Sequence, residues 1–311
     1  MLEVVSEPSL RSMTEIMKIE KLLFVTKFEE LGFDAVRSLL RLTAADLNHV
    51  VFINVIERDR FSMSRVGYRK DEEIRLREAA NIRFIDWSEN LFEQGLEVGV
   101  YIEVGTLVSE VIKAAQNEEA DLIVIGRSHK GMLAHLYSGS DVTELLRRAA
   151  TPVMVYKHLS ETAISIEKPF ERPLVAIDWS PASLRAVEYL KELGDVVSQI
   201  SVVHVAAEKD LKGNSAMAIQ KTRKDTRRKL EEICSRFESA GIDARAHVYV
   251  GDPDEEIEKA ARDCQATMIV LGSSAKAAWV EKWLGSTPRK YAEESIYPTL
   301  LIPPARSEID D

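Results

Sequence analysis

Short apolar runs alternate with longer amphipathic segments along almost the whole chain of 311 residues. The run 48–56 (NHVVFINVI) is rich in β-branched residues and predicts a strand, whereas the apolar positions of 70–94 recur at helical spacing. By these criteria, strands are predicted at 21–28, 48–56, 98–104, 121–125, 152–156, 173–177, 199–205, 244–250, 267–271 and 298–302. Helices are predicted at 34–42, 70–94, 107–117, 140–148, 181–193, 216–240, 253–264 and 286–294. This alternation predicts a parallel sheet with helices on both faces.

The second half of the pattern repeats the first. Residues 120–157 (ADLIVIGRSHKGMLAHLYSGSDVTELLRRAATPVMVYK) align without a gap with residues 266–303 (ATMIVLGSSAKAAWVEKWLGSTPRKYAEESIYPTLLIP). The offset of 146 residues matches glycines, serines and prolines of the two copies, namely Gly105 with Gly251, Gly126 with Gly272, Gly139 with Gly285, Ser140 with Ser286 and Pro152 with Pro298. Solenoid units are roughly 20–50 residues long, so this longer period predicts two copies of one domain.

Each copy has the element order of a doubly wound, Rossmann-like α/β domain with a five-stranded parallel sheet flanked by helices. A chain of 311 residues is long enough for two domains of about 150 residues each. The segment between the copies is polar and has no hydrophobic period. The predicted division is an N-terminal extension (1–20), domain 1 (21–157), a linker (158–171), domain 2 (172–304) and an acidic tail (305–311).

Composition and charge argue against several classes of protein. No apolar run approaches the roughly 20 residues of a membrane span, and the N-terminus lacks the apolar segment of a secretory signal. The net charge of −10 argues against nucleic-acid binding, and we interpret the basic run 221–229 (KTRKDTRRK) as a solvated helix face. With only Cys234 and Cys264, a disulfide framework is excluded, and we expect reduced thiols and a cytoplasmic location.

The sequence contains no recognisable catalytic constellation. None of the six histidines pairs with a cysteine or carboxylate at metal-ligand spacing, so no metal site is predicted. Ser-His-Asp and Cys-His arrangements, the P-loop pattern and the dinucleotide fingerprint are also missing. We therefore expect that the protein is not an enzyme.

The end of each copy combines a strand, spaced glycines, a Gly-Ser at a helix start, a proline and an apolar strand. The Gly-Ser pairs at the predicted helix starts are Gly139-Ser140 and Gly285-Ser286. This arrangement resembles the universal stress protein family in its tandem form, and the resemblance covers nearly the whole chain after about Lys18. It implies an adenine nucleotide alpha hydrolase-like fold and a stress-response regulatory or sensor function. It also implies ATP, ADP or AMP as a ligand, with a divalent cation only together with the nucleotide and with any ATP hydrolysis slow and incidental.

The resemblance places the adenine near the ends of the first two strands and the phosphates on the glycine loop and the next helix. In domain 2 it implies a nucleotide site formed by Asp178, Val205, Gly251, Leu271, Gly272, Gly285, Ser286 and Thr287. In domain 1 it implies a less favoured site formed by Val55, Gly126, His129, Lys130, Gly139 and Ser140. Glycines that end a strand, as we expect of Gly126 and Gly272, let backbone amides approach a phosphate, and a helix N-terminus favours an anion. The alternative for the two serines is a plain N-cap, worth about 1 kcal/mol each.

The copies differ at the end of the first strand. Domain 2 has an acid there, Asp178, as nucleotide-binding members of the family do, whereas domain 1 has Lys27. We expect this lysine to fill the crevice or to pair with Glu29 or Glu57. Domain 2 is therefore the better candidate for the adenine end.

The loops that follow the strands also differ from the family pattern. Gly251-Asp252-Pro253 matches the family's G-x-P turn after the third strand, whereas Gly105-Thr106-Leu107 does not. The middle glycine of the phosphate loop is replaced by His129 in one copy and by Ala275 in the other. If that position needs a positive φ, a residue with a Cβ atom alters the phosphate cradle.

Three functions remain open. The first is a nucleotide-binding stress regulator with its best site in domain 2. The second is an interaction module with both sites degenerate, in which 152–156 pairs with 298–302 within the chain. The third, an ATP-dependent transferase, would need a catalytic cluster that the sequence lacks. We expect intramolecular domain pairing, with a homodimer and an unidentified protein partner as further options, and no contact with nucleic acid or membrane.

Overall fold

The structure is a computed structural model that describes residues 18–28, 32–57, 70–128, 139–158, 168–207, 216–273 and 286–303. The first half contains β1 (Lys21–Val25), α1 (Phe33–Leu39), the 3-10 helix η1 (Leu40–Ala45), β2 (His49–Glu57), α2 (Lys70–Phe92), β3 (Glu97–Gly105), α3 (Leu107–Asn117), β4 (Leu122–Ser128), α4 (Gly139–Arg148) and β5 (Val153–His158). The second half contains β6 (Pro173–Ala176), α5 (Pro181–Lys191), β7 (Gln199–Ala207), α7 (Ala216–Glu238), β8 (Asp243–Gly251), α8 (Pro253–Asp263), β9 (Met268–Gly272), α9 (Ser286–Glu294) and β10 (Thr299–Ile302).

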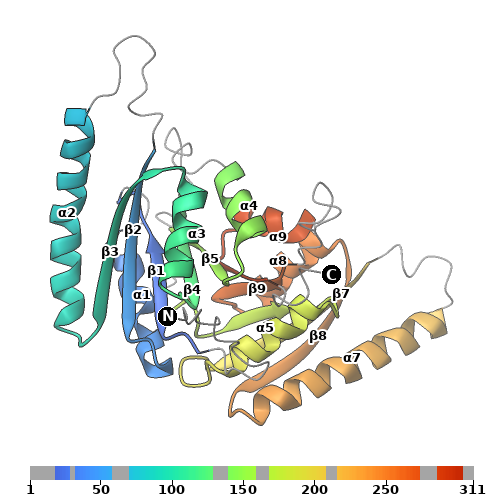
Figure 1. Ribbon diagram of the computed structural model, residues 1–311. Coiled ribbons are helices and arrows are strands. Elements are labelled where there is room, and N and C mark those ends of the chain that lie inside the picture. The colour runs from blue at the N-terminus through green and yellow to red at the C-terminus, as the bar shows by residue number, and fades with distance from the viewer. Residues whose placement is uncertain are drawn as a thin grey trace, which may run out of the picture.

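The described strands form one 10-stranded sheet in the order β3-β2-β1-β4-β5-β10-β9-β6-β7-β8 (Figure 1). Within each half the neighbouring strands are parallel, which confirms the doubly wound five-stranded arrangement predicted for each copy. The two halves meet where β10 pairs antiparallel with β5, with Met154 opposite Leu300. This pairing of the last strands agrees with the sequence prediction, and it covers an edge of each half-sheet.

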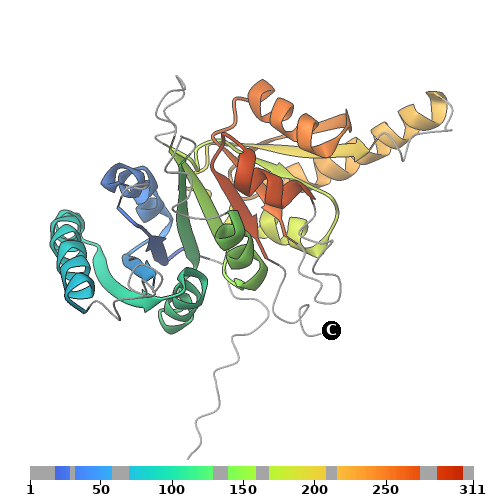
Figure 2. The same ribbon diagram turned by 90° about the horizontal axis from the view of Figure 1, so that it is seen from above.

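Alternating side chains along the strands supply cores on both faces of the sheet. Leu22 and Phe24 point to the face that α1, α2, α5 and α7 cover, whereas Leu23 and Val25 point to the face under α3, α4, α8 and α9. Both cores continue across the junction between the halves, because residues of β5 and β10 belong to each. Helices α4 and α9 lie side by side over this junction, as the view in Figure 2 shows.

Most predicted bounds differ from the observed ones by one or two residues, and β1 ends at Val25 instead of at residue 28. Two other differences have a clear structural cause. The helix expected at 34–42 begins at Phe33, gives way to the 3-10 helix η1 after Leu39, and is stopped at Asp46 by a left-handed φ of 74°. Strand β4 does not end at Gly126, because β5 continues beside it and pairs Ser128 with His158. In the second half the prediction is correct, since β9 ends at Gly272 opposite Ile302.

The long helices α2 and α7 occupy equivalent positions and lie at opposite ends of the molecule (Figure 1). Their solvent-facing residues differ in character. The large exposed apolar residues Ile74, Ile82, Ile85 and Phe92 of α2 correspond, at the repeat offset of 146, to exposed Gln220, Arg228, Glu231 and Glu238 of α7. The basic run 221–229 is largely exposed on α7, in agreement with the predicted solvated face.

Two further observations concern the cysteines and the membrane. Cys234 and Cys264 are both free thiols, as expected. Among the described helices, none is both long enough and apolar enough to cross a membrane.

Candidate functional site

The carboxyl ends of the strands bring several of the candidate residues together. Ala176 of β6 pairs with Val203 of β7 on one side and with Leu271 of β9 on the other. Asp178 follows β6 by two residues, so it lies at the same edge as Val205 and Gly272. This edge, where the strand order reverses, is the usual ligand position of a doubly wound sheet.

Sheet register identifies the equivalent positions in the two halves. Leu23 pairs with Val51 and Ile123, as Leu174 pairs with Ser201 and Ile269. Lys27 is therefore equivalent to Asp178, Phe28 to Trp179, and Asn54 to His204.

An aromatic residue leaves the first strand in a left-handed conformation in both halves. Phe28 and Trp179 each have a φ of 66°. This conformation is strained for a bulky residue, and such strain is concentrated at functional sites. Trp179 remains 36% exposed at the crevice. The repeated outlier marks the turn after the first strand as a specialised position in both copies.

A polar side chain of the second strand holds this turn. The Asn54 amide donates a hydrogen bond to the carbonyl oxygen of Thr26 at 2.8 Å. In domain 2, His204 Nδ1 lies 2.7 Å from the equivalent carbonyl oxygen of Ile177. The His204 ring also contacts Trp179, with 5.6 Å between ring centroids. Asn54 and His204 therefore both fix the backbone just before the aromatic residue.

A cation from the long helix lies over each aromatic ring. The Arg83 guanidinium is 5.1 Å from the centre of the Phe28 ring, and Lys229 Nζ is 5.6 Å from the centre of the Trp179 ring. These cation–π contacts are favourable by about 0.5–1 kcal/mol where they are exposed. We did not single out Arg83 and Lys229 as site residues from the sequence, although the repeat offset of 146 also matches them.

The strand-end charges are opposite in sign and differ in their environment. Lys27 Nζ forms an ion pair with Glu57 Oε1 at 2.9 Å, and the lysine side chain is only 8% exposed. The prediction of pairing with Glu57 is thus correct, while Glu29 lies outside the described residues. Asp178 is exposed, and its Oδ1 accepts hydrogen bonds from the Ser180 N–H at 3.0 Å and the Ser180 hydroxyl at 2.5 Å.

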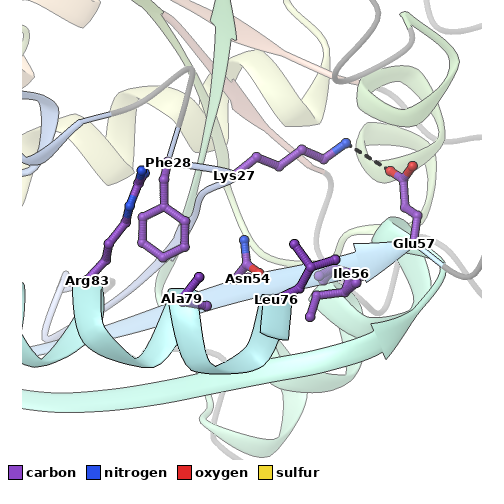
Figure 3. Close-up of a pocket in the computed structure, with 10 residues that line it drawn as sticks. Lys27, Phe28, Asn54, Ile56, Glu57, Leu76, Ala79 and Arg83 are labelled. Carbon is purple, nitrogen blue, oxygen red and sulfur yellow. Dashed lines mark hydrogen bonds and ion pairs between the residues drawn. The ribbon is translucent and has the colours of Figure 1, made fainter. Parts of the chain in front are cut away.

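A pocket of about 150 Å³ opens between the ends of β1 and β2 and helix α2 (Figure 3). The Lys27–Glu57 pair lies at one end and Phe28 with Arg83 at the other. Ten residues line it, namely Lys27, Phe28, Asn54, Val55, Ile56, Glu57, Leu76, Ala79, Ala80 and Arg83. Of the residues predicted for the domain 1 site, Val55 is part of this lining.

Gly272 has a packing role that the sequence did not reveal. A Cβ atom at this position would lie 2.3 Å from the Ser183 backbone nitrogen and 2.5 Å from the Ala182 carbonyl carbon. Helix α5 therefore approaches the end of β9 so closely that only glycine fits. Close packing of a helix on a strand end is one of the reasons for glycine in nucleotide-binding α/β folds.

The ends of the third strands differ as predicted. Gly251 has a φ of 152°, and Asp252 caps α8 by accepting a hydrogen bond from the Asp254 N–H at 2.9 Å. In domain 1, Thr106 precedes α3 and its side chain makes no capping hydrogen bond. The G-x-P turn of the second copy therefore gives a better-capped helix beside the crevice.

The predicted phosphate cradle lies only partly within the described residues. His129, Lys130, Ala275 and Gly285 lie outside the described residues. Helix α4 begins at Gly139, one residue before the predicted start at Ser140, and α9 begins with Ser286 and Thr287, as predicted. No group of three or more histidine, cysteine, aspartate or glutamate side chains suited to a metal occurs within the described ranges.

A second contrast between the halves involves equivalent residues in the middle of β3 and β8. Glu118 accepts hydrogen bonds from the Tyr101 hydroxyl at 2.6 Å and from Lys21 Nζ at 3.0 Å, and these contacts lower its pKa. At the equivalent positions of domain 2, Cys264 Sγ lies 3.8 Å from His247 Nε2. Burial, followed by Arg227 and Arg245, lowers the pKa of His247.

The fold is that of a tandem α/β protein whose two halves are each doubly wound. The universal stress protein family matches residues 18–157 and 169–303, and the chain belongs to this family. Universal stress protein YxiE of Bacillus subtilis is 26% identical over 146 residues, which cover 43% of this chain and 99% of YxiE. A universal stress protein of Mycolicibacterium smegmatis is 25% identical over 214 residues, which cover 68% of this chain and 70% of the relative.

A solved structure matches the tandem arrangement. The crystal structure of a universal stress protein from Archaeoglobus fulgidus superimposes with a TM-score of 0.71 and covers 94% of this chain and 99% of the other. At 22% sequence identity this match establishes the fold alone.

Proposed function

We propose that the protein is a cytoplasmic stress-response regulator that binds one adenine nucleotide in domain 2, without dedicated enzymatic activity. Asp178 is the observation that carries this proposal, because its carboxylate is exposed at the crevice beside Trp179 and His204. A carboxylate accepts hydrogen bonds, and an exocyclic amine such as that of adenine donates them. The Trp179 ring beside this acceptor is 36% exposed and suits stacking of a base.

The phosphate end of the proposed site is formed by Gly272, Gly285, Ser286 and Thr287, with Val205, Gly251 and Leu271 at neighbouring strand ends. The start of α9 at Ser286 supports this assignment, since the free N–H groups of a helix N-terminus favour an anion. In domain 1, the equivalent of the acceptor is Lys27, which Glu57 holds at 2.9 Å. An ammonium group offers only donors to an adenine amine, so domain 1 is the weaker adenine site.

Isothermal titration calorimetry with AMP, ADP and ATP tests the proposal. We expect about one nucleotide per chain, and we expect Asp178→Asn to weaken binding about tenfold. Removing one charge-assisted hydrogen bond has an effect of this size. Asparagine can accept the same turn hydrogen bonds from Ser180, so the local backbone is preserved.

A matched control is available at the other end of the sheet. Asp243 begins β8, is exposed, and accepts a hydrogen bond from Gln199 at 2.8 Å. Asp243→Asn removes the same charge far from the crevice and should leave nucleotide affinity unchanged. Failure of all three nucleotides to bind at millimolar concentration would favour the interaction module with two degenerate sites.

A further inference from the structure

Large apolar side chains gather on the surface at the outer end of domain 1. Among the described residues, five of the seven large apolar side chains that are exposed belong to α2 and to the neighbouring strand β3 (Figure 1). They are Ile74, Ile82, Ile85 and Phe92 of α2 and Val100 of β3. Isolated exposed apolar residues need no explanation, whereas a set gathered on one element indicates an interaction surface.

The corresponding helix of domain 2 shows that the fold does not require this apolar face. Helix α7 has the same place in its half of the molecule, yet its residues at the four α2 positions are Gln220, Arg228, Glu231 and Glu238. Packing of α2 on the sheet depends on another face of the helix, whose buried residues are Ala80, Phe84, Trp87 and Leu91. The exposed apolar residues of α2 are therefore not needed for the fold of a single chain.

The exposed face of α2 has the residue spacing of a helix-pairing seam. Six residues follow one another at alternating intervals of four and three positions, and all of them are exposed except Ser88, which is partly buried. This spacing is the heptad pattern that lines up side chains toward a partner helix in coiled coils. The six residues, called the α2 seam below, are Ile74, Glu78, Asn81, Ile85, Ser88 and Phe92.

The α2 seam is complementary to itself in the reversed direction. In an antiparallel pair with its two-fold axis level with Arg83, residues equally far before and after Arg83 face each other. Ile74 then faces Phe92 of the second copy, which joins two apolar side chains. By the same rule Glu78 faces Ser88, a hydrogen-bond donor, and Asn81 faces Ile85. Every layer of the seam therefore has a partner that it can pack against without a buried like-charge contact.

The residues that flank the seam have complementary charges in the same arrangement. Arg75, Ile82 and Glu89 lie seven positions apart, so they share one side of the helix. The antiparallel pair brings Arg75 beside Glu89 of the second copy and the two Ile82 side chains together near the axis. The Arg75 side chain is 73% exposed, although it also contacts Glu72 at 2.6 Å. In a parallel pair, Arg75 and Glu89 would be about 21 Å apart along the helices, so the charges favour the antiparallel direction.

The chain already contains a junction with this design. Where the two halves meet, β5 and β10 are antiparallel, and α4 and α9 lie side by side over them (Figure 2). A two-fold axis beside α2 would place two α2 helices side by side in the same way, next to the outer strands β3. Arg77 donates a hydrogen bond to the Ile102 carbonyl oxygen of β3, which protects that part of the strand edge. The contact is therefore one between helices and does not require the strands to pair.

We infer that a second copy of this chain docks on the outer face of α2 and forms an antiparallel helix pair through the α2 seam. An interface centred on one helix is small, so pairing is weak and depends on protein concentration. Well below the dissociation constant the chain is monomeric, and the contact then adds nothing to the free energy of unfolding. The inference concerns the outer end of domain 1 and does not require a nucleotide in either half.

Sedimentation equilibrium of the full chain between about 1 µM and about 300 µM tests the inference, because this range covers the dissociation constants of weak, small interfaces. We expect a monomer–dimer equilibrium whose dissociation constant rises at least about tenfold in Ile85→Lys, since the ammonium group would be buried against the second helix. Met217→Lys is the matched control: Met217 is 81% exposed on α7, and the same substitution there should leave the equilibrium unchanged.

Two results of this experiment would overturn the inference. One is a chain that stays monomeric over the whole range, whether another protein or another segment of the chain then covers α2. The other is a dimer that Ile85→Lys leaves unaltered, because its interface would lie elsewhere.

A charge exchange decides the matter if Ile85→Lys fails to fold. Arg75→Glu should raise the dissociation constant about fivefold, because it places a carboxylate beside Glu89 of the second copy. Adding Glu89→Arg should restore the original value, since the two charges are then exchanged. Both positions are exposed, so neither substitution is expected to disturb the fold. A double variant that dimerises no better than Arg75→Glu alone would contradict the antiparallel register.

Discussion

Lys27 in domain 1 and Asp178 in domain 2 occupy the same position after the first strand of the same fold, yet they differ in charge, exposure and bonding partner. Lys27 is 8% exposed and is held by Glu57, whereas Asp178 is exposed and accepts hydrogen bonds from its neighbour Ser180. Around both, the surroundings are preserved: an aromatic residue at a φ of 66°, a polar side chain bonded to the preceding carbonyl, and a cation over the ring. The two halves therefore share the turn and its aromatic residue, but the charge at the end of the first strand has opposite sign.

The largest effect is expected at Gly272, where α5 packs against the end of β9. In Gly272→Ala, the added methyl group would meet the backbone of α5 at 2.3 Å, which side-chain rotation cannot relieve. We expect a loss of about 3 kcal/mol in the free energy of unfolding, measured by urea denaturation.

The control for this prediction is Gly99→Ala in β3. The nearest atom there is Cγ2 of Val51, a side-chain atom, at 3.3 Å. A loss of less than about 1 kcal/mol is expected, because the valine can shift. Equal losses in the two variants would show that α5 does not constrain the end of β9.

The second-largest effect is expected for the ion pair between Lys27 and Glu57 in domain 1. Glu57→Gln removes the carboxylate that lies 2.9 Å from the Lys27 ammonium, and the lysine side chain is only 8% exposed. Because Glu57 itself is 37% exposed, the expected loss in unfolding free energy is about 1–2 kcal/mol, less than for a fully buried pair.

An exposed pair in domain 2 provides the comparison. Arg227 and Glu231 form an ion pair of 3.0 Å, with 67% and 55% side-chain exposure. Glu231→Gln should change the unfolding free energy by less than about 0.5 kcal/mol. If both glutamine variants were equally stable, the burial of Lys27 would have no energetic consequence.

The two halves are expected to lose stability in different ranges of acidic pH, because Glu118 in domain 1 and His247 in domain 2 both have lowered pKa values. The pKa of Glu118 is lowered below its ordinary 4.5 by Tyr101 and Lys21, so its contribution is present above that pH and is lost as the pH falls through the folded-state value. The pKa of His247 is lowered below 6.5 by burial, so the unfolded state takes up the proton first and stability declines from about pH 6.5 downward.

Denaturation midpoints measured from pH 8 to pH 3 separate these contributions. Glu118→Gln should flatten the profile below about pH 4.5, and His247→Gln should flatten the decline that begins at about pH 6.5. His49, whose pKa is also lowered by burial and by Lys21, keeps a decline near pH 6 in both variants. The assignment fails if Glu118→Gln changes the profile near pH 6 and leaves the acid end unaltered.

The smallest effect is expected on the outer face of α2. Ile82 is 69% exposed, and its equivalent in α7 is Arg228. Ile82→Arg should therefore alter the unfolding free energy by less than about 0.5 kcal/mol. A loss above 1 kcal/mol in denaturation experiments would mean that this face is covered in the native protein.

Local sequence patterns predicted most of the fold, because the element type depends on periodicity that each segment carries itself. The helices at 107–117 and 286–294 have the predicted bounds, and the last strands pair as expected. The extension of β4 to Ser128 was not predicted, because it depends on β5 continuing beside it. The 3-10 helix after Leu39 was likewise missed.

The candidate site was predicted less completely, because its parts come from distant elements. Glu57 was one of two partners considered for Lys27, and only the register of β1 against β2 distinguishes it. Arg83 and Lys229 were missed, since a cation on a long amphipathic helix looks like solvated surface. Their recurrence at one offset, beside an aromatic residue in each copy, was the available signal.

The most direct test of the account is the number of adenine nucleotides that one chain binds. Calorimetric titration of the intact protein with AMP should give one site, which Asp178→Asn weakens about tenfold and Asp243→Asn leaves unchanged. Two equal sites per chain, or one site that is indifferent to Asp178→Asn, would contradict the claim that the two halves have diverged in the ligand they accept.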